Sequence, residues 1–264
     1  MKRIHYLGFS MIELMVALTI GLLILVGVVQ VFIGNRGNFR SQNGYAVMQE
    51  SGVYLTEYLS RFIRMAGYRT PPATGSVSGF TPLSTFFTVA SPYITAASNT
   101  GLNGSDSLTI SYQGSGNGTG TPDGLVVDCL NAGVDANKLA TLTFSISNNR
   151  TLQCNSVNAT TGTSLTADVL DNVENFQVLM GEDTDSDGIA NRFVTPNYGG
   201  LNLQNVVAVR ISAMLTSDDG DSPALNSNSY NLLGTLYTPT PDHRLRLLVT
   251  TTIQLRNRLP GSSN

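Results

Sequence analysis

One long apolar stretch near the N-terminus limits the fold more than any other feature of the sequence. Residues 9–33 contain a single charged side chain, Glu13, among 25 positions. At about 1.5 Å per helical residue, this stretch reaches roughly 37 Å and exceeds the ~30 Å hydrocarbon core of a bilayer. The stretch therefore predicts a membrane-spanning helix at 9–33.

Charge is distributed unevenly along the chain. Residues 1–69 hold seven Lys/Arg and three Glu, whereas residues 70–264 hold eight Lys/Arg and fifteen Asp/Glu. By the positive-inside tendency, Lys2 and Arg3 stay in the cytoplasm, so the chain after residue 33 lies across the membrane. The formal net charge of −3 argues against nucleic-acid binding through a large positive charge, and we expect no nucleic-acid partner.

A cleavable signal peptide and a plain signal anchor are the alternatives for residues 9–33. A signal peptide has an apolar region of about 7–15 residues that ends at a small-residue cleavage site, and this longer stretch runs on into a polar helix. A plain anchor fits the length. Neither alternative explains Glu13, because a carboxylate at membrane depth costs several kcal/mol without a partner.

The N-terminal residues resemble those of a type IV prepilin. In KRIHYLGFSMIELMVALTIG, residues 2–21, a short basic leader ends at Gly8, a hydrophobic Phe9 follows, and Glu13 stands five positions into the mature chain. This resemblance implies that an inner-membrane prepilin peptidase cuts between Gly8 and Phe9 and methylates the new amine. It also implies that the Phe9 amine of a neighbouring subunit neutralises Glu13 during assembly.

The resemblance extends to the PilW family of minor pilins, which help to start or cap pilus assembly. It is carried by LTEYLSRFIRMAGYR at 55–69 and RLLVTTTIQLRNRL at 246–259. Thr70 and Pro71 stand where many relatives continue with Gly-Cys, so the cysteine pairing of this chain differs. The resemblance implies a single-pass inner-membrane subunit with a periplasmic head, which moves to the pilus and cell surface and whose partners are other pilin and minor pilin subunits.

Two other functions stay open at this stage. A type II secretion pseudopilin of the J type shares the N-terminal motif and the plan of the head. A membrane-anchored periplasmic enzyme or binding protein could carry the same leader. The sequence has no GxSxG, HExxH or CxxC motif, and the glycine-rich run within 98–121 fits no phosphate-binding pattern. His243 is expected to be an isolated surface residue, so we expect no enzymatic activity.

Residues 34–67 predict an amphipathic continuation of the membrane helix. Its apolar face is formed by residues at alternating steps of three and four: Tyr45, Met48, Gly52, Leu55, Leu59, Phe62 and Ala66. We expect residues 52–66 to cover a sheet of the chain's own head. Gly34, Gly37 and Gly44 are expected to bend or unwind the join, and Gly67 is expected to end the helix.

The remainder, residues 68–264, predicts a β-rich head. Strand-like runs separated by Gly, Asn, Ser, Asp and Pro clusters occur at 107–112, 125–129, 140–146, 173–181, 205–215 and 246–257. The sequence thus predicts an α+β, type IV pilin-like fold, in which a long N-terminal helix packs on an antiparallel sheet. Its expected parts are a leader at 1–8, the membrane helix at 9–33, its continuation at 34–67 and the head.

Cys129 and Cys154 are the two cysteines of the chain. In an oxidising compartment an even count and a loop of this length predict a disulfide between them. Two free buried cysteines are the alternative.

An acidic segment predicts a calcium site in the head. Asp183, Asp185 and Asp187 followed by Gly188 match the first half of a calcium loop, in which alternate carboxylates converge at a sharp turn. The expected further ligands are the backbone carbonyl of Ile189 and either Asn191 or a water molecule.

The second half of the calcium pattern is missing. Val194 stands where an EF-hand has its bidentate Glu, so Glu182 or another nearby acid would have to replace it. A solvated acidic turn is the alternative, since Asp, Ser and Gly are common turn residues. A second acidic turn at 217–221 lacks the alternate spacing and is expected to be solvated.

Overall fold

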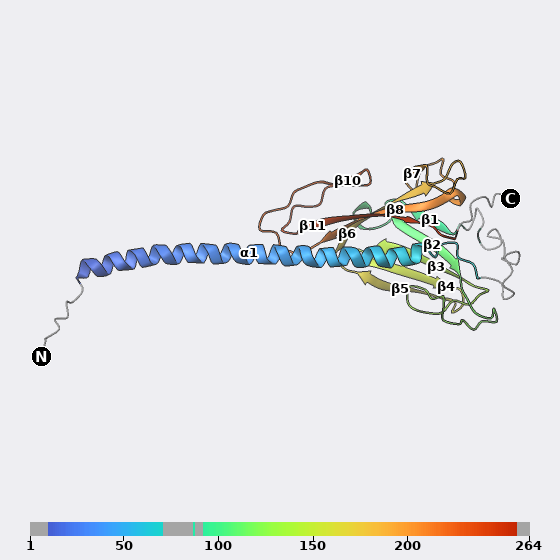
Figure 1. Cartoon of the computed structure of the whole chain (residues 1–264), viewed down its shortest axis with the longest axis horizontal. Coiled ribbons are helices and arrows are strands. Elements are labelled where there is room, and N and C mark those ends of the chain that lie inside the picture. The colour runs from blue at the N-terminus through green and yellow to red at the C-terminus, as the bar shows by residue number, and fades with distance from the viewer. Residues whose placement is uncertain (1–9, 71–86, 88–91, 258–264) are drawn as a thin grey trace.

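The computed structural model describes residues 10–70, 87 and 92–257, so the leader and the cleavage site at Gly8 and Phe9 lie outside the described residues. Helix α1, Met11–Ile63, is one uninterrupted helix of 53 residues. Its N-terminal half projects from the head as a stalk, and its C-terminal half lies along the head (Figure 1). The predicted membrane helix and its continuation therefore form one element.

The predicted unwinding of α1 at its glycines is wrong. The helix continues through Gly34, Gly37 and Gly44, because helical propagation on both sides of each glycine outweighs its cost of about 1 kcal/mol. Gly44 has a packing role instead. A Cβ added there would lie 3.1 Å from Asp221 Oδ2 and 3.2 Å from Leu245 Cδ1, so glycine permits the head to approach the helix closely.

The end of α1 falls earlier than the glycine signal predicted. The helix ends at Ile63 and residues 64–67 form a turn. Gly67 has a φ of +72°, which favours glycine, and its N–H donates to the Ser111 carbonyl at 3.0 Å. Gly67 therefore closes the turn after the helix and connects it to the head.

The head contains two larger antiparallel sheets and one hairpin among the described residues. The first sheet has the order β1-β2-β3-β4-β5, the second has the order β11-β8-β6-β7, and β9 pairs with β10. The strands are β1 (Ile94–Ala97), β2 (Ser107–Gln113), β3 (Leu139–Ile146), β4 (Leu152–Asn158), β5 (Thr163–Leu170), β6 (Val173–Glu182), β7 (Arg192–Val194), β8 (Val206–Thr216), β9 (Tyr230–Leu232), β10 (Thr235–Tyr237) and β11 (Arg246–Gln254). This architecture confirms the α+β, pilin-like fold class.

The predicted strand at 125–129 is wrong. This segment forms turns and a single bridge between Val127 and Gly133. The buried Asp128 carboxylate accepts the N–H groups of Leu130 and Ala132, both at 2.9 Å. Such local side-chain bonds stabilise a turn at the expense of a sheet ladder.

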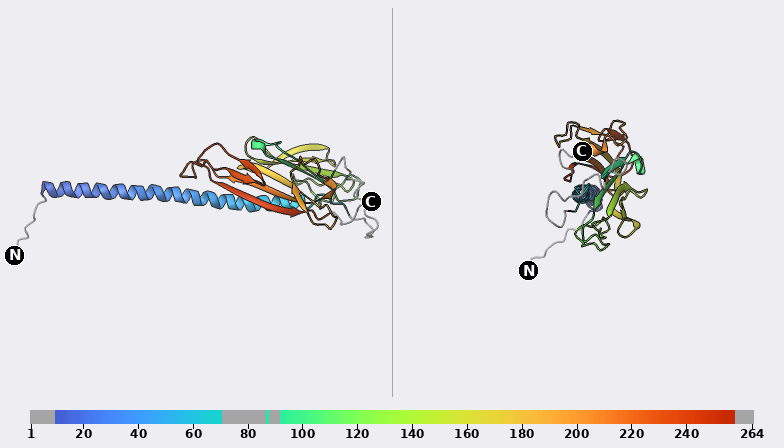
Figure 2. Two further views of the ribbon diagram at one scale, coloured as in Figure 1. Left: turned by 90° about the horizontal axis from the view of Figure 1, so that it is seen from above. Right: turned by 90° about the vertical axis from the view of Figure 1, so that its right-hand side faces the viewer.

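The core lies between the C-terminal half of α1 and both larger sheets. Leu59 is fully buried, and the Phe62 and Phe144 rings lie 6.2 Å apart, which joins α1 to β3. On the other sheet, Gly52 faces Val249 of β11 so closely that an added Cβ would lie 2.9 Å from its Cγ2. Seen end-on, the helix has the sheets on adjoining sides (Figure 2).

These contacts confirm that the second half of the helix covers its own head. Of the apolar positions predicted to form the packed face, those from Met48 to Ala66 are buried. Tyr45 is the exception, with 43% of its surface exposed, and Gly44 is the buried residue at that level. The packed face therefore begins at Gly44.

Candidate functional site

The N-terminal half of α1 is an apolar surface without a partner in this chain. None of the residues in 11–33 is buried, although the segment is rich in Leu, Ile and Val. Among the described residues, α1 is the one helix long and apolar enough to cross a membrane. Water cannot favourably solvate such a surface, so a bilayer or other apolar helices must cover it.

Glu13 takes part in a capping box at the start of this apolar segment. Its carboxylate accepts the Ser10 N–H at 2.9 Å, and Ser10 Oγ accepts the Ile12 N–H at 3.2 Å. The helix N-terminus also carries partial positive charge that favours a nearby carboxylate. Glu13 thus has a partner within its own chain, which the S-x-x-E spacing could have predicted.

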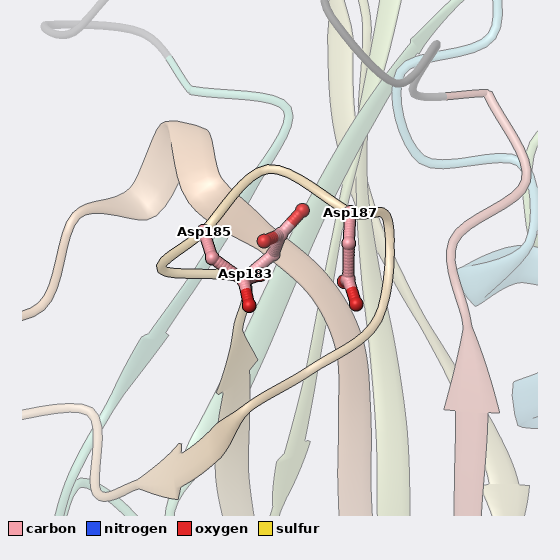
Figure 3. A group of neighbouring side chains, drawn as sticks. All are labelled: Asp183, Asp185 and Asp187. Carbon is pink, nitrogen blue, oxygen red and sulfur yellow. The ribbon is translucent and has the colours of Figure 1, made fainter.

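The three aspartates of the acidic loop lie together between β6 and β7 (Figure 3). One carboxylate oxygen from each of Asp183, Asp185 and Asp187 lies within 4.8 Å of the others. Asp183 is buried, whereas Asp185 and Asp187 are exposed. Gly188, with a φ of +86°, makes the sharp turn that the pattern requires.

Backbone N–H groups hold two of these carboxylates in place. Asp183 accepts the N–H of Ser186 at 2.6 Å and of Gly188 at 2.9 Å, and Asp187 accepts that of Ile189 at 2.7 Å. Each carboxylate oxygen has a second lone pair, so these bonds leave capacity for a cation. The same bonds also form in a metal-free turn.

The closing ligands expected for calcium have other contacts. Asn191 Oδ1 accepts the Thr184 N–H at 2.7 Å, while its amide donates to Asp185 Oδ2 at 3.1 Å. Glu182 is buried and bonded to Arg192 at 2.8 Å and to the Asn202 N–H at 3.1 Å. Glu182 therefore stabilises the hairpin through Arg192, and its carboxylate is already engaged where it was expected to replace the missing bidentate Glu.

Cys129 and Cys154 form the disulfide that the sequence predicted, with their Cα atoms 6.5 Å apart. The bond connects the turn around Asp128 to β4. The alternative of two free cysteines is therefore wrong. His243 is exposed, and its Nδ1 lies 3.1 Å from the Ser222 carbonyl oxygen, as expected for a surface histidine.

The sequence analysis missed a buried ionic cluster at the start of β11. The Arg246 side chain is fully buried and bonded to Glu174 at 2.6 and 3.1 Å and to Asp242 at two distances of 2.8 Å. Burial alone would lower the pKa of Arg246, but its bonds to Glu174 and Asp242 raise that pKa above its ordinary value. The cluster connects β6 and β11 to the loop before β11.

A long helix with an exposed apolar half and a head of antiparallel sheets defines the class of a membrane-anchored, pilin-like subunit. Residues 141–257 match the family Type IV Pilus-assembly protein W, and residues 5–29 match the prokaryotic N-terminal methylation motif. These matches confirm the resemblance to the PilW family of type IV pilins. No curated protein matches the chain. The matched family has a structural role in pilus assembly.

Proposed function

We propose that the protein is a minor pilin of a type IV pilus, stored in the inner membrane with its head in the periplasm, which primes or joins pilus assembly. The observation that carries the proposal is the division of α1: the C-terminal half is buried in the head, whereas 11–33 is apolar and exposed. Such a helix can leave the bilayer only if other apolar helices cover it.

In this proposal the N-terminus of the helix controls assembly. A prepilin peptidase cuts between Gly8 and Phe9, and the methylated Phe9 amine of one subunit pairs with Glu13 of the next. Before assembly, the capping box with Ser10 partly satisfies Glu13. After assembly, the positive amine compensates its charge in a medium where an unpaired carboxylate is costly.

Processing and assembly can be tested together in the native host. Purified fibres should contain the protein beginning at a methylated Phe9, and a Gly8→Leu variant should accumulate uncut in the membrane. Glu13→Val should insert into the membrane normally, because removing the carboxylate lowers the insertion cost, but should enter fibres poorly. Mass spectrometry of the N-terminus and immunodetection in sheared fibres measure both. Normal incorporation of the Val variant, or an intact Met1 in fibres, would contradict the proposal.

The two alternative functions predict other outcomes. A J-type pseudopilin would support protein secretion and be dispensable for surface pili, whereas the PilW match supports the pilus. An anchored enzyme would leave fibres intact when deleted. Loss of fibres on deletion, restored by the native chain but not by Glu13→Val, therefore supports the minor pilin over both.

We also propose that the acidic loop of the head binds calcium. The grouped oxygens of Asp183, Asp185 and Asp187 support this proposal, because three nearby carboxylates repel one another without a cation. Since Glu182 is bonded to Arg192, affinity should be modest, in the range of roughly 10⁻⁴ to 10⁻³ M. Calcium binding would stabilise the loop against unfolding by mass action.

The calcium proposal is tested by thermal unfolding in millimolar calcium, millimolar magnesium and chelator. Calcium should raise the melting temperature of the native protein more than magnesium does, because magnesium requires a tighter octahedron. Asp185→Ala should abolish the shift and leave the calcium-free melting temperature nearly unchanged. Asp219→Ala, in the second acidic turn, is the matched control and should retain the shift. Equal melting temperatures of the native protein in calcium and chelator would favour the solvated turn.

A further inference from the structure

A groove of about 430 Å³ lies where α1 leaves the head. One wall is α1 at Gly44, Val47 and Met48. The other is formed by residues 168–172, at the end of β5 and in the turn that follows it, and by residues 215–218 and Asp221, at the end of β8 and in the loop that follows it. Ser41 Oγ donates to the Asp221 carbonyl at 2.7 Å and fixes this second segment against the helix. The groove is therefore a built feature of the junction between helix and head.

The walls of the groove carry four carboxylates: Asp168, Asp171, Asp218 and Asp221. Among the described residues, none of the four forms an ion pair. Arg244 donates to the carbonyl of Ser217, a residue of the groove wall, but its guanidinium lies 3.7 Å from Asp242. The groove thus combines a helix wall of mixed polarity, which also includes Asn43 and Ser51, with an excess of negative charge, which favours a cationic partner.

The complementary charge occurs on the same helix, just below the groove. Arg36 and Arg40 are exposed, and neither forms an ion pair within the part of the chain that the structure describes. Arg40 is one turn below Gly44, but its own guanidinium is not within ion-pair distance of Asp221. Val47, 54% exposed, lines the groove and gives its helix wall an exposed apolar side chain.

We propose that the groove binds Arg40 of a second copy of the chain, whose α1 lies parallel and is displaced toward the head by about one helical turn. This inference rests on the proposed function, in which the Phe9 amine of one subunit pairs with Glu13 of the next, and adds that both subunits are copies of this chain. That pairing sets a displacement of four residues, or about 6 Å. The same displacement brings Arg40 of the displaced copy level with Gly44, at the entrance of the groove.

A second copy is the occupant because one register then satisfies both ends of the helix. Sliding two parallel helices by four residues covers apolar side chains of 11–33 and places a guanidinium beside Asp218 and Asp221. A guanidinium forms forked, charge-assisted hydrogen bonds with carboxylates, and its stem can lie along Val47. A larger slide would separate Phe9 from Glu13.

Zero-length carbodiimide cross-linking between two tagged full-length copies tests this contact. The first copy carries Arg40→Lys with Asp218→Asn and Asp221→Asn, so the amine introduced at position 40 cannot link to those positions in its own chain. The second copy has an intact groove and native Arg40. The chain otherwise contains Lys2, in the leader, and Lys138. Replacing Arg64, which is exposed at the other end of the helix, by Lys in the first copy gives the matched control.

We expect Lys at position 40 of the first copy to be linked to Asp218 or Asp221 of the second copy roughly tenfold more often than Lys at position 64 is. Mass spectrometry of membranes and fibres measures these links. A tenfold ratio corresponds to about 1.4 kcal/mol. Arg40→Glu should reduce entry into fibres, and Asp221→Lys in the other copy should restore it. Thermal unfolding of the groove variants confirms that each folds.

The outcomes separate this inference from the proposed function. Processed copies that enter fibres together but show no excess of links at residue 40 would overturn the groove contact and leave the pilin function standing. Links from residue 40 to a different pilin alone would also overturn the assignment to a second copy. A native chain that is neither processed nor found in fibres would overturn the proposed function, on which the inference rests.

Discussion

Replacing Arg246 by Met tests how strongly the buried ionic cluster holds the head together. The Arg246 side chain is fully buried, and Glu174, with 6% of its side chain exposed, loses both of its bonds to the guanidinium in the variant. Asp242 has 24% of its side chain exposed and can exchange its bonds for water. The main cost is therefore the buried Glu174 carboxylate, which loses its cation and keeps only the hydrogen bond with Tyr237.

The expected loss is about 3 kcal/mol of unfolding free energy, at the lower end of the ~3–5 kcal/mol for breaking a buried pair, because water compensates Asp242. For a head of this size, 3 kcal/mol corresponds to a decrease in melting temperature of roughly 6–12 °C. Thermal unfolding of the full chain in detergent, followed by circular dichroism in the aromatic region, measures it.

Two further variants make the reasoning refutable. Glu174→Gln combined with Arg246→Met should recover part of the loss, because the uncompensated charge is removed. Arg244→Met should lower the melting temperature less, because its partner Asp242 has 24% of its side chain exposed and keeps its bonds to Arg246. A decrease below about 2 °C for Arg246→Met, or no recovery in the double variant, would refute the assignment of the cost to Glu174.

Three further predictions concern the head. The Cys129–Cys154 bond closes a separation of 25 residues and should contribute about 3 kcal/mol; denatured, unreduced protein should bind no maleimide, and reduction should lower the melting temperature. Leu59→Ala should cost about 2–5 kcal/mol because Leu59 is fully buried, whereas Val53→Ala at an exposed position should stay within about 0.5 kcal/mol, both measured by thermal unfolding. Burial raises the pKa of Tyr58 from 10.0 to about 12. The contribution of the protonated phenol to folding stability is therefore complete below pH 10 and is lost as the pH rises through 12. Tyrosinate absorbance during alkaline titration should show a late-titrating group that Tyr58→Phe removes.

The sequence predicted those elements whose periodicity is strong. The apolar positions from Met48 to Phe62 repeat at helical spacing and are buried on one face, and β8 and β11 were found from their alternating runs. β4 and β5 were missed because QCNSVN and the exposed TSLTADVL carry few apolar residues at alternate positions. β5 is an edge strand of its sheet, and most of its side chains are exposed. Because few of its positions must be apolar, its sequence shows only a weak alternation of apolar and polar residues.

Local patterns also decided which parts of the candidate sites were predictable. The acidic loop, the capping box of Ser10 and Glu13, and the prepilin-like N-terminus each lie within a few consecutive residues, so their spacing carries the signal. The Arg246 cluster combines residues about 70 positions apart, because Glu174 lies on β6 and Arg246 on β11. Whether Glu182 is free to bind a metal depends on the position of Arg192. The pairing of β6 with β7 places Arg192 opposite Glu182, and the sequence alone did not indicate that pairing.

The groove shows why an assembly surface is harder to predict than a core. Its two acidic segments meet because β6 and β8 are antiparallel, with Val173 opposite Leu215, so the turn before β6 lies beside the loop after β8. Their carboxylates have no ion-pair partner among the described residues, and Arg40 is exposed below them. Within one chain, these charges look like ordinary solvated surface. They become complementary only when two parallel helices are displaced by one turn. The contact between Arg40 and the groove therefore depends on the register between two copies, which the pattern of a single sequence does not display.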